Sequence, residues 1–93
     1  MSLEIVASTR FRKDLKKAIR RGFDMSLLDV VVKTLAAEKP LPPKNCDHAL
    51  SGRFVGCREC HVTPDWLLIY EVDAGALLLY LTRTGTHSDL FCL

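Results

Sequence analysis

Long hydrophobic runs are missing from this 93-residue sequence, and so is a leader-like start. No apolar stretch approaches the roughly 18 residues that a membrane-spanning helix requires. The opening MSLEIVASTR has no basic segment followed by an apolar one, so we expect no secretion signal. These absences predict a cytoplasmic protein without a membrane partner. Repeats and low-complexity tracts are also lacking, and the length predicts a single domain over residues 1–93.

Cysteine is scarce, with four copies, and nothing at the start of the sequence directs the chain to an oxidising compartment. Structural disulfides and covalently attached haem both occur mainly in exported proteins, so we expect free thiols. A hydrophobic content of 48% is ordinary for a globular chain and supports a core without such cross-links. Neither Cys46 nor Cys92 shows an evident role.

One short stretch, CRECH at 57–61, nevertheless matches the attachment signature of a c-type haem. Residues 53–62 alternate as a strand does, which puts Cys57 and Cys60 on opposite faces. Ligands to one haem or one zinc ion must converge, so this parity argues against a haem, a redox dithiol, or a zinc site that includes Cys46 and His48. We favour the interpretation that Cys57 and Cys60 are small, partly buried hydrophobes.

The net charge of +2 is small, but its distribution is uneven. Seven Lys and Arg residues within 1–22 face two acidic ones, which gives +5 there and −3 in the rest. The basic residues that we single out are Arg10, Arg12, Lys13, Lys16, Lys17 and Arg20. Such asymmetry indicates an anionic partner, either nucleic acid or an acidic protein, although a solvated helix face has the same composition.

The first half of the sequence predicts a strand followed by two amphipathic helices. Ser8 or Thr9 can cap the first helix, Gly22 is placed to end it, and Asp24 can cap the second. The expected elements are a strand over 3–7, helices over 9–21 and 24–38, a stiff Pro-rich connector over 39–45 and a loop over 46–52.

After Gly52 the hydrophobic period changes from 3.6 to 2. The expected elements are strands over 53–62, 66–72 and 76–83, turns at 63–65 and 73–75, and a closing loop or short turn from residue 84. Consecutive strands with short turns form an antiparallel meander. The order β-α-α-β-β-β predicts an α+β fold, a mainly antiparallel sheet with two N-terminal helices packed on one face.

The sequence holds only three histidines, His48, His61 and His87, and the expected strands can bring them to one edge with Asp65 and Arg83. Metal-free RNA cleavage needs a base for the 2′-hydroxyl, an acid for the leaving 5′-oxygen and a cation for the phosphate. Imidazole suits the first two tasks because its unperturbed pKa lies near neutrality. Three aromatic side chains could stack on a base, those of Trp66, Tyr70 and Phe91.

Each of these side chains also has an ordinary interpretation. Arg83 can pair with a carboxylate on a strand, Trp66 can belong to the core, and Asp65 after Pro64 is common turn chemistry.

Three motifs together resemble the YafQ branch of the RelE/ParE superfamily, bacterial toxins of type II toxin–antitoxin modules. They are D-H-x-L-x-G at 47–52, H-V-x-P-D-W-L-L-I-Y at 61–70 and R-T-G-T-H-x-x-L-F at 83–91. The first half agrees in pattern, so the resemblance spans nearly the whole sequence. It implies a β-α-α-β-β-β fold and an endoribonuclease, without metal or cofactor, that cuts messenger RNA in the ribosomal A site.

The resemblance also implies roles for individual residues. Proton transfer would fall to His48, His61, Asp65 and His87, phosphate stabilisation to Arg83, and substrate positioning to Trp66 and Phe91. Our hypothesis is that His48 with Asp65 serves the base side and His87 the acid side.

The partners that the resemblance implies are the 70S ribosome with its messenger RNA, and a cognate antitoxin that binds DNA and regulates its own operon. The toxin would be monomeric when free and hetero-oligomeric with the antitoxin. The basic helix over 9–21 would dock on ribosomal RNA and be covered by the antitoxin.

A different class of function stays open. ParE-type relatives share the fold but act on gyrase, so this chain could bind a protein target without cleaving RNA. The presence of His48, His61 and His87 together with Asp65 and Arg83 favours the nuclease.

Overall fold

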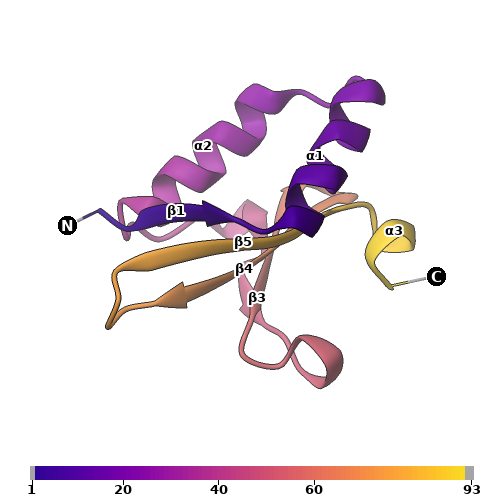
Figure 1. Cartoon of the computed structure of the whole chain (residues 1–93). Coiled ribbons are helices and arrows are strands. Elements are labelled where there is room, and N and C mark those ends of the chain that lie inside the picture. Colours follow the sequence, from indigo (N-terminus) through magenta and orange to yellow (C-terminus); the bar gives the residue numbers. More distant parts are fainter. Residues whose placement is uncertain (1, 92–93) are drawn as a thin grey trace.

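Two helices from the first half of the chain lie on the same face of a five-stranded sheet (Figure 1). The structure is a computed structural model that describes residues 2–91, so Cys92 lies outside the described residues. The elements are β1 (Glu4–Ala7), α1 (Thr9–Arg20), α2 (Met25–Ala36), β2 (His48–Ala49), β3 (Arg58–Thr63), β4 (Trp66–Asp73), β5 (Leu78–Gly85) and α3 (His87–Phe91), with 3₁₀ turns at Pro43–Asn45 and Gly52–Phe54. The predicted α+β class is confirmed.

The two long helices start where the sequence signals are. The Ser8 hydroxyl accepts the backbone N–H of Phe11 at 2.9 Å, and the Asp24 carboxylate accepts that of Ser26 at 3.0 Å. Gly22 has a φ of +79° after the end of α1, the left-handed conformation that a glycine stop supplies. Local sequence therefore determines both helix starts.

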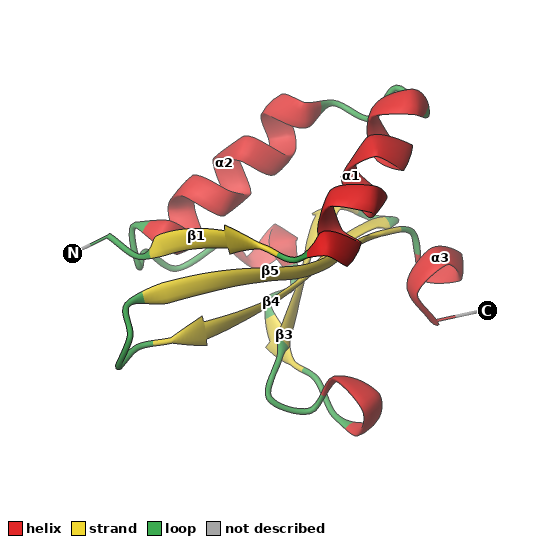
Figure 2. Cartoon of the chain, viewed as in Figure 1, coloured by secondary structure: helices red, strands yellow, loops and turns green. Residues whose placement is uncertain are grey.

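The main core lies between these helices and the sheet (Figure 2). Phe11 and Ala18 of α1 and Leu28 of α2 pack onto a sheet face that includes Leu68 and Leu79. A second, smaller cluster lies on the other face, where Leu67, Ile69 and Leu90 are buried. Both faces of β4 are therefore covered, which explains why Trp66–Tyr70 reads as a continuous apolar run. Within residues 2–91 there is no helix with the length and hydropathy of a membrane span.

The strand order is β1-β5-β4-β3-β2. Strands β3, β4 and β5 form the predicted antiparallel meander, while β1 pairs with β5 in parallel, Glu4 opposite Leu78. Beyond Leu81 the edge of β5 has no strand partner among the described residues, and side chains from the start of α1 take its place. The Ser8 hydroxyl donates to the carbonyl of Thr82 at 2.9 Å, and the Asp14 carboxylate accepts the N–H of Thr84 at 3.2 Å.

Three predicted boundaries were wrong. The strand expected over 53–62 begins only at Arg58, because Gly52 and Gly56 take positive φ values of 64° and 91° that extended backbone cannot have. The loop expected over 46–52 instead contributes the two-residue strand β2. The last expected strand runs two residues later than 76–83, over Leu78–Gly85, and the helix α3 follows it.

Candidate active site

Three polar side chains from β2 and β3 share the sheet face opposite α1 and α2. His48 pairs with Glu59, Glu59 with Ile69, and His61 with Leu67, and directly paired residues point to the same face. Because Leu67 and Ile69 belong to the small cluster on that face, His48, Glu59 and His61 lie there too. The sequence suggested that His61 ends a strand, but β3 continues to Thr63, so His61 is an inner residue of it.

His48 is held by a contact at each ring nitrogen. Its Nδ1 lies 2.7 Å from the carbonyl oxygen of Cys46, which can only accept, so Nδ1 carries a proton. Its Nε2 lies 3.1 Å from Oε2 of Glu59. A neutral Nε2 lone pair and a carboxylate oxygen repel each other at that distance. A proton bound between Nε2 of His48 and Oε2 of Glu59 would remove that repulsion.

The segment that carries His48 is fixed to the sheet by its neighbour Asp47. Oδ1 of Asp47 accepts the hydroxyl of Tyr70 at 2.6 Å and Nε of Arg58 at 3.2 Å. Burial, followed by the bond to Asp47, raises the pKa of the Tyr70 hydroxyl, which therefore stays a donor. Cys46 adopts a left-handed conformation with a φ of 48° that turns the chain into β2.

Glu59 is the functional candidate that the sequence analysis missed. Its side chain is only 7% exposed, and its Oε1 has no hydrogen-bond partner within residues 2–91. A buried carboxylate oxygen without a partner is costly, and such groups concentrate at functional sites. The signal was present in the sequence, since Glu59 and His61 have the same parity along one expected strand.

His61 lies between the two other histidines. Its Nε2 is 4.0 Å from Oε2 of Glu59, and its ring centroid is 5.7 Å from that of His87, with the rings edge to face. The buried amide of Asn45 donates to the backbone carbonyl of His61 at 2.7 Å and ties the 3₁₀ turn to β3. The three histidines expected to meet therefore do so.

Asp65 belongs to His87 and not to His48, which corrects the pairing that we expected. Nδ1 of His87 lies 2.6 Å from Oδ1 of Asp65, and the backbone N–H of His87 donates to the same oxygen at 3.2 Å. These bonds lower the pKa of the Asp65 carboxyl. With Nδ1–H directed to a carboxylate, Nε2 is the ring nitrogen of His87 that is left for another partner.

The two aromatic residues expected to position the substrate, Trp66 and Phe91, differ in burial. Trp66 is 2% exposed, its ring packs at 5.0 Å from that of Phe23, and its indole N–H donates to the Thr84 hydroxyl at 2.9 Å. It is therefore a core residue without an open face for stacking. Phe91 is half-buried at the end of α3, edge to face with Phe54 at 6.0 Å.

Arg83 lies in the same cross-strand row as His48 and Glu59, through Ile69. Its guanidinium bonds to Asp14 of α1 through two nitrogens, at 2.6 and 3.1 Å. Arg83 is thus an ion-pair residue, as the ordinary interpretation expected, but its carboxylate partner lies on a helix and not on a strand. The pair is largely buried, with the side chains 16% and 12% exposed.

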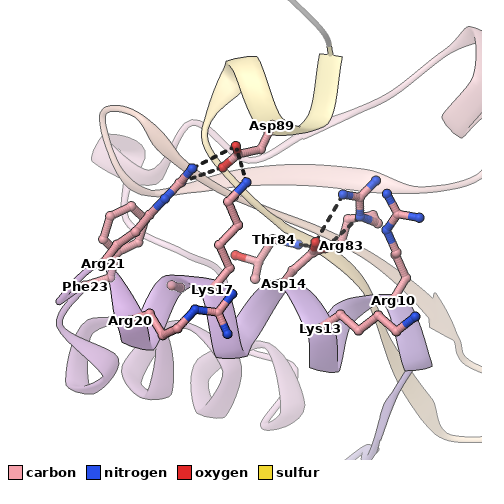
Figure 3. Close-up of a pocket in the computed structure, with 12 residues that line it drawn as sticks. Arg10, Lys13, Asp14, Lys17, Arg20, Arg21, Phe23, Arg83, Thr84 and Asp89 are labelled. Atoms are coloured by element: carbon pink, nitrogen blue, oxygen red, sulfur yellow. Dashed lines mark hydrogen bonds and ion pairs between the residues drawn. The ribbon is translucent and has the colours of Figure 1, made fainter.

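A basic groove adjoins this ion pair, between α1 and the end of β5 (Figure 3). Its cationic lining residues are Arg10, Lys13, Lys17, Arg20, Arg21 and Arg83. Of the residues singled out from the sequence, Arg12 and Lys16 are exposed on α1 but do not line it. Lys17 and Arg21 converge on Asp89 of α3, as Figure 3 shows.

The cysteines do not converge. Cys60 is fully buried in the main core, where burial raises the pKa of its thiol to about 12. Cys57 packs against the small cluster on the other face. The two thiols therefore belong to opposite faces, as parity predicted, although Cys57 precedes β3. Within residues 2–91 no group of three His, Cys, Asp or Glu side chains could hold a metal ion.

Comparison with known proteins gives one consistent result. Residues 3–92 match the family described as "Bacterial toxin of type II toxin-antitoxin system, YafQ". The chain is 42% identical over 89 residues to the mRNA interferase toxin YafQ of Escherichia coli K12, covering 95% of each chain.

Solved structures agree. The toxin chain in the E. coli DinJ-YafQ toxin–antitoxin complex superposes with a TM-score of 0.88 at 40% identity, covering 98% of this chain and 99% of that one. A metal-bound toxin from Helicobacter pylori gives a TM-score of 0.90 at 48% identity, covering 96% and 99%. The chain therefore belongs to the YafQ family of bacterial type II toxin–antitoxin toxins.

Proposed function

We propose that this chain, an endoribonuclease of the YafQ toxin family, cuts translated messenger RNA in the ribosomal A site by attack of a 2′-hydroxyl, without a metal. The curated E. coli relative is named as an mRNA interferase. The observation that carries the proposal is the meeting of His48, His61 and His87 with two carboxylates, those of Glu59 and Asp65, in one cluster.

Two histidine–carboxylate pairs can supply the two proton transfers of the reaction. We define the inner pair as His48 with Glu59 and the outer pair as His87 with Asp65. In the outer pair, Asp65 stabilises a His87 imidazolium and directs its Nε2–H outward, which suits the acid that protonates the leaving 5′-oxygen. In the inner pair, a proton taken from the 2′-hydroxyl can be held between Nε2 of His48 and Oε2 of Glu59, which suits the base side.

The phosphate and the rest of the substrate have their own supports. Arg83, oriented by Asp14, brings a cation to the margin of the site. Of the three aromatic candidates, Phe91 is the one that is partly exposed, and Trp66 acts by fixing Thr84 and the end of β5. The exposed cations of α1 supply phosphate contacts for ribosomal RNA, and an antitoxin that covers them would block docking.

The test is to map cut sites on a message that is translated in a purified system and on the same message without ribosomes. Cuts confined to the translated message, leaving 2′,3′-cyclic phosphate and 5′-hydroxyl ends, support the proposal. Cuts on free RNA contradict ribosome dependence. Growth arrest on expression without any RNA cleavage would favour the gyrase-type alternative, in which the fold binds a protein target.

A further inference from the structure

The helix α3 places His87 in the site, yet it has only five residues and cannot be stable by itself. Near its end, Leu90 is buried against Leu67 and Ile69, and Arg53 donates to the carbonyl of Leu90 at 3.0 Å. These contacts anchor the last turn. The start of the helix, where His87 lies, depends on Asp89.

Asp89 and Thr86 form a reciprocal cap around His87. The hydroxyl of Thr86 accepts the backbone N–H of Asp89 at 3.2 Å, and Oδ2 of Asp89 accepts the backbone N–H of Thr86 at 3.0 Å. This is a capping box with Asp at the third helical position. It fixes the backbone on either side of His87.

The same carboxylate ties α3 to α1. Arg21 donates to both oxygens of Asp89, at 2.7 and 3.1 Å, and Nζ of Lys17 lies 3.1 Å from Oδ1 (Figure 3). The side chain of Asp89 is only 15% exposed. A Cβ at Gly85 would lie 3.0 Å from Oδ2 of Asp89, so the end of β5 also lies close to the Asp89 side chain. Asp89 thus joins β5, α1 and α3 at one point.

We propose that Asp89 is a positioning residue for RNA cleavage, which holds His87 at Asp65 through the cap at Thr86 and the bonds to Lys17 and Arg21. The inference rests on the proposed function. Asp89 does not touch the reacting atoms. It acts because a short helix held at one end only would let the His87 ring move relative to His61, and errors of about 1 Å in placement cost roughly 100-fold in rate.

The experiment compares Asp89→Asn, Asp89→Glu and Arg21→Gln in ribosome-dependent cleavage, with kcat and KM determined separately. Asp29→Asn is the matched control, since Asp29 pairs with Lys33 at 2.8 Å on α2, away from the site. We expect Asp89→Asn to lower kcat by about 10- to 100-fold with KM unchanged, and Asp89→Glu to restore most of it. Arg21→Gln should lower kcat less. The double variant Asp89→Asn with Arg21→Gln should lower kcat no further than Asp89→Asn alone.

A second readout is independent of activity. In NMR spectra of the isolated chain, the imidazole signals of His87 should shift or broaden in Asp89→Asn while those of His48 stay in place. Unchanged His87 signals with an unchanged kcat would overturn the inference. So would equal disturbance of His48 and His87, which indicates a general loss of structure. If the wild-type chain cleaves no RNA, the proposed function fails, and the His87 signals alone decide the positioning role.

Discussion

The inner and outer pairs contain the same chemical groups in different surroundings. In the inner pair the carboxylate of Glu59 is buried and keeps one oxygen unpaired, whereas its partner His48 is half exposed. In the outer pair the carboxylate of Asp65 is 69% exposed. It accepts the backbone N–H and the Nδ1–H of His87. Water thus solvates one carboxylate, and protein surrounds the other. The difference teaches that two pairs of the same chemical groups can meet very different amounts of water within one candidate site.

The largest expected effect separates the two pairs by role. His87→Ala and His48→Ala should each lower cleavage by about 10²- to 10⁴-fold. A message with sulfur in place of the leaving 5′-oxygen at the cut site needs no acid, because a thiolate leaves unprotonated. That substrate should rescue His87→Ala and leave His48→Ala slow. Rescue of His48→Ala instead would exchange the assignments of acid and base.

The carboxylates give the next effect. Glu59→Gln should reduce cleavage by about 100-fold, because the amide cannot hold the shared proton. Asp65→Asn should cost less, since its amide oxygen still accepts Nδ1–H of His87. Glu59→Gln should also leave the free energy of unfolding within about 1 kcal/mol of the wild-type value, because it removes a buried charge but also weakens the contact with His48. Denaturant unfolding at neutral pH measures this. A strongly destabilised Glu59→Gln would assign Glu59 to the fold and not to the chemistry.

Charge reversal on α1 should weaken ribosome binding while the inner and outer pairs stay intact. Reversal of Lys13 and Lys16 to Glu should weaken ribosome binding by about tenfold or more and flatten its dependence on salt. Lys17 is left out because it also binds Asp89. Lys33→Glu on α2 is the control. An unchanged affinity across a salt series would remove α1 from the docking surface.

The smallest effect concerns the pKa of Asp65. The bonds from His87 lower this pKa, so ionised Asp65 stabilises the folded state at pH values above about 3.9, and the contribution is lost as the pH falls through the lowered pKa. In His87→Ala the side-chain bond is gone, and the pKa should rise toward its ordinary value. Carboxyl ¹³C NMR titration measures it. An unmoved pKa would mean that the outer pair does not form in solution.

The sequence predicted elements correctly where hydrophobic residues recur over many positions or where a capping residue lies next to its helix. Asp24 caps the second long helix as expected, and Ser8, one of the two residues considered, caps the first. The β-prone apolar run of β4 was also recognised. Strand β2 was missed because two residues carry no periodicity. The helix α3 was missed although T-H-S-D at 86–89 is a readable capping box.

The sequence predicted which histidines meet in the candidate site better than it predicted which carboxylate lies beside each of them. The meeting of His48, His61 and His87 was expected, but the carboxylate beside each one depends on contacts between residues distant in sequence. His87 and Asp65 are 22 positions apart, and their bond depends on the turn between β3 and β4 meeting the end of β5. The positions of Trp66 in the core and of Arg83 against Asp14 likewise follow from tertiary packing.

The parallel pairing of β1 with β5 has a consequence for the order in which the molecule is made. Residues 4–7 leave the ribosome early, but their partners at 78–81 and the His87 of α3 are among the last described residues to be synthesised. Chains fold as they emerge, from the N-terminus onward. A growing chain therefore has His48 and His61 long before it has the sheet edge and helix that complete the site. On this topology the candidate site is complete only after residues 78–91 have been added to the chain.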